Sequence, residues 1–414
     1  MSLPMGSPLA RHWMLGPDVV FLNNGSFGAC PRAVMAARAA VLERSEREPI
    51  EFLVNDYWAM MDRSREALGR VVKTAAENIV FLPNATHAVT TILANLRLEA
   101  GDELIVNAQE YSACVANFER AAERAGARLV YAQIPFPALD EEEIVEAVVS
   151  AASERTRLCL LSHVTSPTAI VMPVAKIVKQ LRERGIETLV DGAHAPGYCE
   201  VDIDGLGAAY YTANCHKWLC SPRGSAFLAV RKELQATFRP LVLSVFTRKP
   251  RTDRSFYNLE FDYVGTQDYS PAICIADAIE HVPSLIDGTW EDVRARNRAL
   301  ALEARDLLCG RLGVEPPVAD GMIGSMATIE LPEHDEVRQR ALLARPTRYH
   351  DALQDRLVGV HRVQVPVMSL AGVDGARAKR AFRISCQLYN SLEQYAYLAD
   401  ALVEELRRER EMGI

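Results

Sequence analysis

Short apolar segments alternate with amphipathic stretches between about residues 70 and 230. The apolar segments predict β-strands at residues 78–82, 103–107, 127–131, 158–163, 187–191 and 209–213. In the stretches 113–125 and 173–184, apolar residues recur every three or four positions, which predicts helices. Continuous apolar strands separated by helices are typical of a largely parallel sheet covered on both faces. The pattern therefore predicts an α/β fold, with ligands at the carboxyl ends of the strands.

The pattern changes beyond residue 230. Residues 246–262 are polar and basic and predict a long excursion from the sheet, and residues 289–312 have the period of a long helix. Further strand candidates and a charged terminal helix follow, at 325–331, 361–367, 381–385 and from Leu392 onward. This mixture predicts a smaller α+β domain. We expect an N-terminal segment at 1–30, a large domain at 31–285 and a small domain at 286–414.

The charge balance and the cysteines narrow the class of protein. The 54 acidic and 46 basic residues give a net charge of −8, which favours a small-molecule substrate over nucleic acid or anionic membranes. Residues 248–254 are an alternative nucleic-acid contact, but a local basic loop is more typical of a solvated face. Nine scattered cysteines without a C-x-x-C pair predict reduced thiols. The chain has no basic leader and no apolar run of ~18 residues, so we expect a cytoplasmic protein without a membrane anchor.

Three polar features lie at predicted strand ends. Asp191 closes E-T-L-V-D, Lys217 follows the strand 209–213 within N-C-H-K-W-L-C, and Asn84 and Thr86 stand in N-A-T-H between a strand and a helix. Taken singly, the lysine is more typical of a solvated surface, the aspartate of a turn, and the N-A-T-H pair of a helix cap. Their common placement favours a shared site.

One cofactor chemistry explains the three features together. Pyridoxal phosphate needs a lysine for a Schiff base, an acid beside its ring nitrogen and a cradle for its phosphate. Lys217 and Asp191 supply the first two groups. The helix that begins near Thr86 offers backbone N–H groups and a positive dipole end to a phosphate. The sequence therefore predicts a pyridoxal phosphate enzyme, without a metal site.

Motifs along nearly the whole chain resemble a known family. They are F-L-N-N-G-S-F-G-A-C-P, P-N-A-T-H-A-V, V-D-G-A-H-A-P-G, N-C-H-K-W-L-C-S-P-R-G, V-G-T-Q-D and F-R-I-S-C-Q-L-Y-N. The chain resembles the class V aminotransferase-type enzymes of pyridoxal phosphate fold-type I, and most closely their isopenicillin N epimerase-like branch. The resemblance implies a large domain with a mostly parallel central sheet and a smaller α+β C-terminal domain.

The resemblance also implies roles for individual residues. Lys217 would bond to the cofactor, Asp191 would pair with the pyridine nitrogen, His194 would lie near the phenolic oxygen, and Tyr111 would stack on the ring. The remaining cofactor contacts implied are Ala85, Thr86, Thr168, Asn214 and His216. Thr266 in G-T-Q-D matches a position that reaches the phosphate across a dimer interface, so a homodimer is implied.

Two further positions concern the substrate. Arg383 matches the arginine that binds the substrate carboxylate, and a planar guanidinium suits that task because it forms two parallel hydrogen bonds. Asn24 stands where many relatives have histidine in L-N-H-G-S-F-G, and we expect it at the substrate. We expect the first half-reaction, which is common to the family, not to depend on this replacement. The replacement does concern which specific reaction follows.

The expected reaction begins with removal of the α-proton of an amino acid by Lys217. Return of a proton to the opposite face gives epimerisation, loss of a β-sulfur group gives C–S lysis or desulfuration, and reprotonation of the cofactor gives transamination. The resemblance favours an epimerase of the isopenicillin N type. A persulfide-type desulfurase is disfavoured because no cysteine precedes Arg383 in a loop. A noncatalytic scaffold is a remote alternative, since the chain keeps Lys217, Asp191 and Arg383 together.

Overall fold

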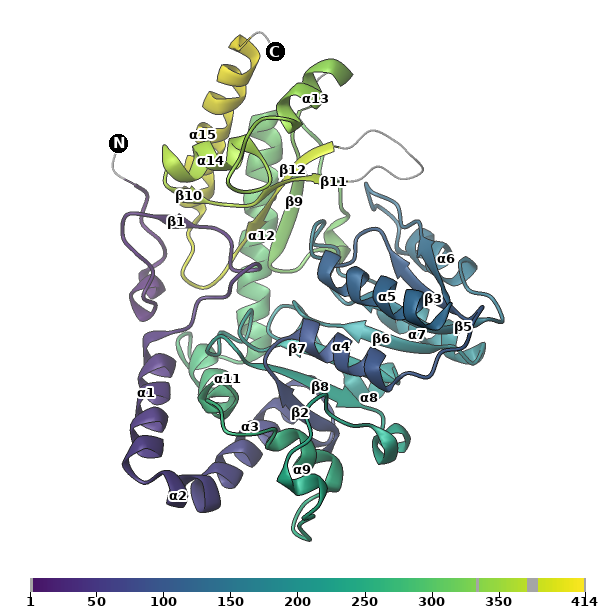
Figure 1. Cartoon of the computed structure of the whole chain (residues 1–414). Helices are drawn as coiled ribbons and strands as arrows, with labels where there is room; N and C mark the ends of the chain where they lie inside the picture. Colours follow the sequence, from purple (N-terminus) through teal and green to yellow (C-terminus); the bar gives the residue numbers. More distant parts are fainter. Residues whose placement is uncertain (1–2, 333–334, 371–378, 413–414) are drawn as a thin grey trace.

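The computed structural model describes residues 3–332, 335–370 and 379–412 (Figure 1). Its central feature is a seven-stranded sheet with the strand order β2-β8-β7-β6-β5-β3-β4. The strands are β2 (Ile79–Leu82), β3 (Glu103–Asn107), β4 (Arg128–Ala132), β5 (Thr156–Ser162), β6 (Glu187–Asp191), β7 (Tyr210–Asn214) and β8 (Ala226–Val230). Each predicted strand between residues 70 and 230 forms part of this sheet, with ends that differ by a residue or two.

The sheet is parallel from β4 to β7, and β8 lies antiparallel between β7 and β2. The sequence analysis missed β8, although A-F-L-A-V is a short apolar run behind Gly224, which has a φ of +93°. Because β7 and β8 are adjacent and antiparallel, the chain reverses between them. Lys217 lies in this reversal, at the carboxyl end of β7.

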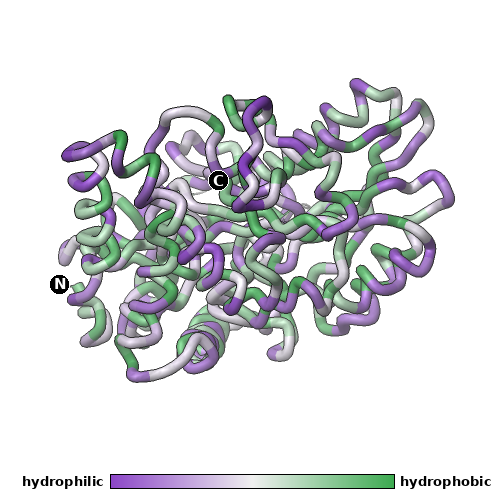
Figure 2. Tube along the Cα trace, turned by 90° about the horizontal axis from the view of Figure 1, so that it is seen from below, coloured by the Kyte–Doolittle hydropathy of each residue, from purple (hydrophilic) through white to green (hydrophobic). Residues whose placement is uncertain are grey.

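Helices cover both faces of the sheet, as predicted. Leu104 and Val106 face a core that includes helices α4 (Ala85–Asn95), α5 (Ser112–Ala125) and α9 (Phe256–Asp262). Ile105 faces the opposite core, which includes α3 (Tyr57–Val72), α6 (Glu141–Ser150), α7 (Val174–Glu183) and α11 (Ile275–Ser284). Figure 2 shows hydrophobic residues along the strands and hydrophilic residues on the outer helices. This two-sided burial explains why the strands are continuously apolar.

Several helices were not expected from the sequence. Upstream of the sheet lie α1 (Arg32–Arg47), α2 (Pro49–Glu51) and a π-helical turn (Phe52–Asp56) that leads into α3. The short helices α8 (Ile203–Leu206) and α10 (Ser270–Ile273) lie downstream. Within the predicted excursion 246–262, the side chains of Arg251 and Arg254 lie over the Trp58 ring, with guanidinium carbons 4.7 and 4.5 Å from its centre. These two arginines are therefore turned onto the protein.

The C-terminal part is the predicted α+β unit. Helix α12 (Trp290–Leu312) packs on α15 (Leu392–Glu411) and on β9, and it begins with a capping box at Thr289. An antiparallel sheet has the order β11-β12-β9, with β9 (Met326–Glu330), β11 (Val367–Leu370) and β12 (Lys379–Ser385). Helices α13 (Glu336–Leu343) and α14 (Ala352–Gly359) complete the described unit. The predicted strand 361–367 is divided in two, because Pro366 interrupts it and has no N–H to donate.

The N-terminal segment is attached to the C-terminal unit. Strand β1 (Val20–Phe21) pairs in parallel with β10 (Val363–Gln364), and the amide of Ser7 donates to the carbonyl of Tyr389 over 3.0 Å. Both ends of the described chain lie beside the smaller sheet in Figure 1. The boundaries at residues 30 and 285 stay predictions. Among the described residues, no helix combines the length and the apolar character needed to cross a membrane.

Candidate active site

The loop that carries Lys217 is held from behind by the N-terminal segment. The side-chain amide of Asn24 donates to the Lys217 carbonyl over 3.4 Å. Gly28 passes so close that an added Cβ would lie 2.4 Å from the Lys217 carbonyl oxygen and 2.7 Å from its Cα. The next residue, Trp218, is completely buried. The backbone of Lys217 is therefore fixed, and the freedom left to the residue lies in its side chain.

The Lys217 amine lies in an environment that disfavours its charge. Its Nζ is 3.1 Å from Nε2 of His194. Burial, followed by the positive charge of Arg383, lowers the pKa of Lys217 to about 8, although the Asp191 carboxylate opposes this shift. A substantial fraction of the amine is therefore neutral near pH 8, and a neutral amine is the form that attacks carbonyl groups and accepts protons.

Asp191 ends strand β6 and is 3% exposed. Its Oδ1 accepts a hydrogen bond from the amide of Ala193 over 2.9 Å, and the thiol of Cys114 donates to its Oδ2 over 3.4 Å. Burial raises the pKa of Asp191, while its hydrogen bond from Ala193 and the charge of Lys217 act in the opposite direction. A buried carboxyl group of this kind is suited to face a positively charged ring nitrogen, because that charge would remove the burial penalty.

Glu110 is a second buried acid at the site, and the sequence analysis did not single it out. Its carboxylate accepts hydrogen bonds from the amide and the hydroxyl of Ser162, the residue that pairs with Asp191 in the neighbouring strand. Burial raises the pKa of Glu110 to about 8. The anchored Glu110 leaves the next residue, Tyr111, on the outside, where it is 48% exposed at the start of α5. Stacking of the Tyr111 ring on a cofactor stays a prediction.

The start of helix α4 is built as an anion cradle. The Asn84 side chain accepts a hydrogen bond from the amide of His87 over 2.8 Å, and Oδ1 of Asn214 accepts from the amide of Ala85 over 2.9 Å. Asn214 thereby ties the end of β7 to this helix. Within the described part of the chain, the first-turn amide of Thr86 has no partner. A free N–H at the positive end of a helix dipole fits a phosphate.

His216 lies beside this cradle, and one of its two ring nitrogens already has a hydrogen-bond partner. Its Nδ1 donates to the Ser225 carbonyl over 2.8 Å, because a carbonyl can only accept, so Nε2 is the atom that is left for a ligand. Burial lowers the pKa of His216 to about 4, and a bound phosphate dianion would favour the protonated ring. Phosphate contact by this histidine stays a prediction.

The two predicted threonine contacts have different surroundings. Thr168 is buried, shares a hydrogen bond of 2.7 Å with Thr165, and donates to the side chain of Gln109. Thr266 is exposed, and its hydroxyl lies 3.2 Å from that of Tyr263. An exposed threonine on a surface loop is free to face another subunit, so neither prediction is contradicted.

Arg383 brings a guanidinium from β12 into the site. Its side chain is buried, Nη2 donates to the Ser26 hydroxyl over 3.0 Å, and Nη1 donates to the Ser166 carbonyl. Its Nε is buried and has no hydrogen-bond partner among the residues that the structure describes. Burial lowers the pKa of Arg383 to about 10. A buried guanidinium with an unmatched charge and an unused N–H fits a carboxylate ligand.

Comparisons with known proteins place this site in a family. Residues 20–398 match the family model described as Aminotransferase class-V. The chain belongs to the class V aminotransferase family. An isopenicillin N epimerase from Amycolatopsis lactamdurans is 32% identical, over 94% of this chain and 96% of that protein. A probable chloroplastic L-cysteine desulfhydrase from Arabidopsis thaliana is 28% identical, over 93% of this chain and 82% of that protein.

The solved structures agree on the fold. A cysteine desulfurase from Escherichia coli superposes with a TM-score of 0.74 at 18% identity, covering 96% of this chain and 98% of that one. Membership in the class V family confirms the predicted fold class, and it confirms an enzyme that depends on pyridoxal phosphate. The residues described above fit this cofactor, since they include a lysine of lowered pKa, a buried acid and an open helix N-terminus.

Asn24 has a different environment from the one expected of a residue at the substrate. Its Oδ1 accepts hydrogen bonds from the amide of Ala29 over 3.2 Å and from the hydroxyl of Tyr389 over 3.0 Å, while its Nδ2 donates to the Lys217 carbonyl. In this class V enzyme, Asn24 therefore joins the lysine loop to the N-terminal and C-terminal segments. Contact between Asn24 and a substrate stays a prediction.

Sequence reasoning missed several residues of the class V site. They include Ser26 and Ser166, which hold Arg383, as well as Glu110, Trp218 and Tyr389. Ser26 could have been noticed within N-N-G-S-F-G, and Glu110 could have been noticed because it precedes Tyr111. Nothing local distinguishes Ser166 or Tyr389, since their partners lie more than 200 positions away in the chain.

A separate group of possible metal ligands lies in the C-terminal unit. Ligand atoms of His361, Glu404 and Glu405 lie within 4.8 Å of one another. Arg356, however, donates two hydrogen bonds of 2.9 Å to the Glu405 carboxylate, and Nε2 of His361 lies 2.8 Å from the same group. The charge of Glu405 is thus already matched, and we interpret the group as an ion-pair cluster that fastens α14 to α15.

Proposed function

We propose that this enzyme epimerises an amino acid or amino-acid derivative at its α-carbon. The observation that carries the proposal is a lysine of lowered pKa whose charge interacts with that of a nearby buried arginine. Lys217 has a pKa of about 8, and the charge of Arg383 is one cause of that value. Within the described ranges, the buried Nε of Arg383 has no hydrogen-bond partner. A carboxylate bound at Arg383 would bring the adjacent α-carbon toward Lys217 as a proton acceptor.

The cofactor is pyridoxal phosphate, and this chain would hold it at three points. Lys217 would bind it covalently, Asp191 would face its ring nitrogen, and the N-terminus of α4 at Thr86 would receive its phosphate. Bound pyridoxal phosphate supplies an electron-withdrawing ring that accepts the electron pair left when the α-proton departs. This assignment is supported by the burial of Asp191, by the free amide of Thr86 and by the family.

We assign separate roles in the reaction to Arg383, Lys217 and Tyr111. Arg383 orients the substrate through its carboxylate. Lys217, once freed from the cofactor, takes the α-proton on one face as a neutral amine. Epimerisation also requires a proton donor on the other face, and we assign that role to Tyr111 or to a water that it holds. The exposure of Tyr111 at the start of α5 supports this assignment, because the phenol is not engaged inside the protein.

A second candidate reaction is the elimination of a β-sulfur group. It is favoured by the cysteine desulfhydrase relatives and by the fact that elimination needs a single base, which Lys217 supplies. Persulfide chemistry is a poorer fit, since the cysteines near the lysine and Arg383 are buried and burial raises their thiol pKa values. These cysteines are Cys215, Cys220 and Cys386.

We also propose that the enzyme is a homodimer in which Thr266 reaches the partner's phosphate site. Exposed apolar side chains support an interface, since monomers rarely expose such groups together. They are Ile50, Val54, Leu241, Val242, Leu243 and Val245. The two segments are neighbours, because Phe246 packs edge-on against Trp58 with ring centres 5.5 Å apart. Analytical ultracentrifugation tests the dimer, and Thr266→Ala should weaken cofactor binding only while the dimer persists.

The reaction is tested with cofactor-loaded protein in deuterated water. L- and D-amino acids, L-cysteine and isopenicillin N are each incubated, and the α-position is followed by NMR. Epimerisation predicts α-deuterium in both configurations, elimination predicts pyruvate and sulfide from L-cysteine, and transamination predicts a keto acid with pyridoxamine phosphate. Either of the last two outcomes, without loss of optical purity, overturns the epimerase proposal.

Two variants sharpen the assignment of the bases. Lys217→Ala should remove the visible absorbance of lysine-bound cofactor and all α-exchange. Tyr111→Phe should leave α-deuterium exchange with retained configuration but abolish inversion if the phenol is the donor on the second face. If Tyr111→Phe still inverts its substrate at the wild-type rate, the second-face role of the phenol is wrong. A β-elimination would be insensitive to that hydroxyl.

A further inference from the structure

His194 lies between the Lys217 amine and the Trp218 indole at the centre of the site. It follows β6 in D-G-A-H and is 3% exposed. Its Nε2 lies 3.1 Å from the Lys217 amine, and its Nδ1 lies 3.4 Å from the indole Nε1 of Trp218. Both ring nitrogens therefore have a defined neighbour, and these neighbours determine which nitrogen carries the proton.

The Trp218 contact decides the tautomer. An indole N–H can donate a hydrogen bond but has no lone pair to accept one, so Nδ1 of His194 must be the acceptor. A neutral imidazole carries a single proton, which must then be on Nε2. Burial, followed by the charges of Lys217 and Arg383, lowers the pKa of His194 well below its ordinary value, so the ring is neutral. The Nε2–H consequently points at the lysine amine.

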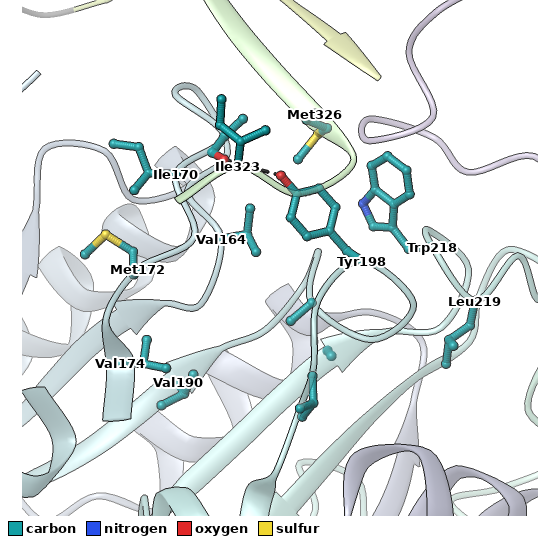
Figure 3. Packing of buried hydrophobic residues seen from close by; sticks show 14 of the residues in the cluster. Val164, Ile170, Met172, Val174, Val190, Tyr198, Trp218, Leu219, Ile323 and Met326 are labelled. Atoms are coloured by element: carbon teal, nitrogen blue, oxygen red, sulfur yellow. Dashed lines mark hydrogen bonds between the residues drawn. The ribbon is translucent and has the colours of Figure 1, made fainter. Parts of the chain in front are cut away.

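The indole itself is held in place. Trp218 is completely buried, and its ring packs edge-on against Tyr198 with centres 5.1 Å apart and an interplanar angle of 68°. The Tyr198 hydroxyl donates to the Ala169 carbonyl and accepts from the amide of Gly324, both over 3.3 Å. Figure 3 shows the indole beside the Tyr198 ring and Met326, with the Tyr198 hydroxyl turned away from the indole. Packing against Tyr198 thus helps to fix the indole and the direction of its N–H.

We propose that Trp218 is a positioning residue that locks His194 in the Nε2–H tautomer. His194 then always presents a hydrogen-bond donor, never an acceptor, to the atom that occupies the position of the lysine amine. In the cofactor-free chain that atom is the Lys217 nitrogen, which accepts the Nε2–H hydrogen bond in its neutral form. With the cofactor bound, the same N–H is available to its phenolic oxygen, a consequence that rests on the proposed function, whereas the tautomer does not.

The Trp218–His194 hydrogen bond matters chemically because the two tautomers of His194 act in opposite ways on an oxygen placed beside Nε2, such as the phenolic oxygen of the cofactor. An Nε2–H stabilises a negatively charged oxygen, while an Nε2 lone pair would repel it. Loss of the lock should therefore make that oxygen harder to deprotonate. It should not alter the binding of a substrate carboxylate, which is the task of Arg383. If Trp218 acted through packing alone, there would be no reason to expect a change in the deprotonation of that oxygen together with unchanged carboxylate binding.

The variant that separates the two roles is Trp218→Phe, which keeps an aromatic ring against Tyr198 and removes the N–H. Trp290→Phe is the matched control, since the Trp290 Nε1 donates to the Ile279 carbonyl over 3.1 Å, outside the site. Both proteins are labelled with ¹⁵N-histidine and studied by long-range ¹H–¹⁵N NMR, with and without pyridoxal phosphate. His194→Gln identifies the signals of this histidine by their loss.

The wild-type protein should show the Nε2-protonated pattern for His194, Trp290→Phe should show the same pattern, and Trp218→Phe should show the other tautomer or a mixture. In addition, the pH midpoint of the visible absorbance of bound cofactor should rise by about one unit in Trp218→Phe and stay unchanged in Trp290→Phe. An Nδ1-protonated His194 in the wild-type protein overturns the proposal without any variant. An unchanged tautomer in Trp218→Phe also overturns it. If the tautomer behaves as expected but no epimerisation is found, the proposed function alone has failed.

Discussion

Two arginines of β12, Arg380 and Arg383, allow the fold and the active site to be perturbed separately. Each is 3% exposed, and they are three residues apart in the same strand. Arg380 is ion-paired with Asp351 at 2.7 Å and with Glu409 at 2.9 Å, whereas Arg383 has no described acidic partner. We predict that Arg383→Met removes activity with little change in stability. Arg380→Met should do the opposite.

The expected change in the free energy of unfolding for Arg383→Met follows from the surroundings of the Arg383 side chain. Burial lowers the pKa of Arg383 from an ordinary value of 12.5 to about 10. At 1.36 kcal/mol per pKa unit, this difference opposes folding by about 3 kcal/mol. Because the folded pKa lies below the unfolded one, the penalty is complete below pH 10 and disappears only as the pH rises from 10 to 12.5. The lost hydrogen bonds to Ser26 and Ser166 contribute about 1 kcal/mol each, so the free energy of unfolding should change by less than about 1.5 kcal/mol.

Arg380→Met leaves the buried Asp351 carboxylate without its described cation and removes one of two arginines from Glu409, which keeps Arg345 at 2.8 Å. Burial works against the charge of Arg380, but its hydrogen bonds and ion pairs with Asp351 and Glu409 prevail and raise its pKa. Removing one partner of a buried ion pair costs about 3–5 kcal/mol. The midpoint of urea denaturation should therefore fall sharply in this variant. Its KM for an amino-acid substrate should stay at the wild-type value while the protein is folded.

The activity loss of Arg383→Met follows from the substrate carboxylate. Two hydrogen bonds to a charged group contribute about 1.5–3 kcal/mol each, so kcat/KM should fall by about 10² to 10⁴-fold. Urea denaturation and steady-state kinetics on the three proteins test both halves of the prediction. Retained kcat/KM in Arg383→Met, or a loss of several kcal/mol in its stability, would show that Arg383 is a structural residue and refute the reasoning.

Three further predictions concern the lysine loop. The rate at which cofactor-free protein binds pyridoxal phosphate through Lys217 should rise with pH around a midpoint near 8, because the neutral amine is the form that reacts. Stopped-flow absorbance measures this rate, and a midpoint near 10 would contradict the lowered pKa of Lys217. Asn24→Ala should lower the free energy of unfolding by about 2–4 kcal/mol in chemical denaturation, since it leaves the Tyr389 hydroxyl and other buried groups unpaired; a neutral effect would place the Asn24 contacts in doubt. Gly28→Ala should cost about 1–3 kcal/mol and weaken cofactor binding, because the new Cβ would lie 2.2 Å from the His216 carbonyl. Gly310→Ala has nothing within 4 Å of its Cβ and should be neutral or stabilising by the same assay.

Local patterns predicted six of the seven strands of the central sheet, and they indicated where to expect the chemistry. Strands β2, β3, β5, β6 and β7 are almost entirely buried, so each appears in the sequence as an apolar run, whereas the edge strand β4 is buried only at Ala132. Lys217 and Asp191 could be located because each follows such a run, where ligands bind in α/β sheets. Strand β8 was missed because a five-residue apolar run behind a turn does not reveal its antiparallel direction.

The contacts that hold the site were beyond local patterns. Ser26 is 357 positions from Arg383, and Asn24 is 365 positions from Tyr389. Nothing in the sequence around Ser26 or Asn24 indicates a hydrogen-bond partner far along the chain. The resemblance to class V enzymes located Asn24 but implied a substrate role, while the structure shows its amide bound to the Lys217 backbone and to Tyr389. The tertiary fold therefore supplies the information that the sequence pattern lacked.

In the proposed mechanism, the basicity of the Lys217 amine depends on whether Arg383 has bound a substrate carboxylate. Burial lowers the pKa of both groups, and the charge of Arg383 further lowers that of Lys217. A carboxylate bound to Arg383 cancels that charge, so the amine loses one cause of its weak basicity at the moment when it must accept a proton. Arg383→Met imitates this neutralisation, and the Lys217 midpoint for cofactor binding should therefore rise above 8 in that variant. An unchanged midpoint would mean that burial alone sets the basicity of the lysine.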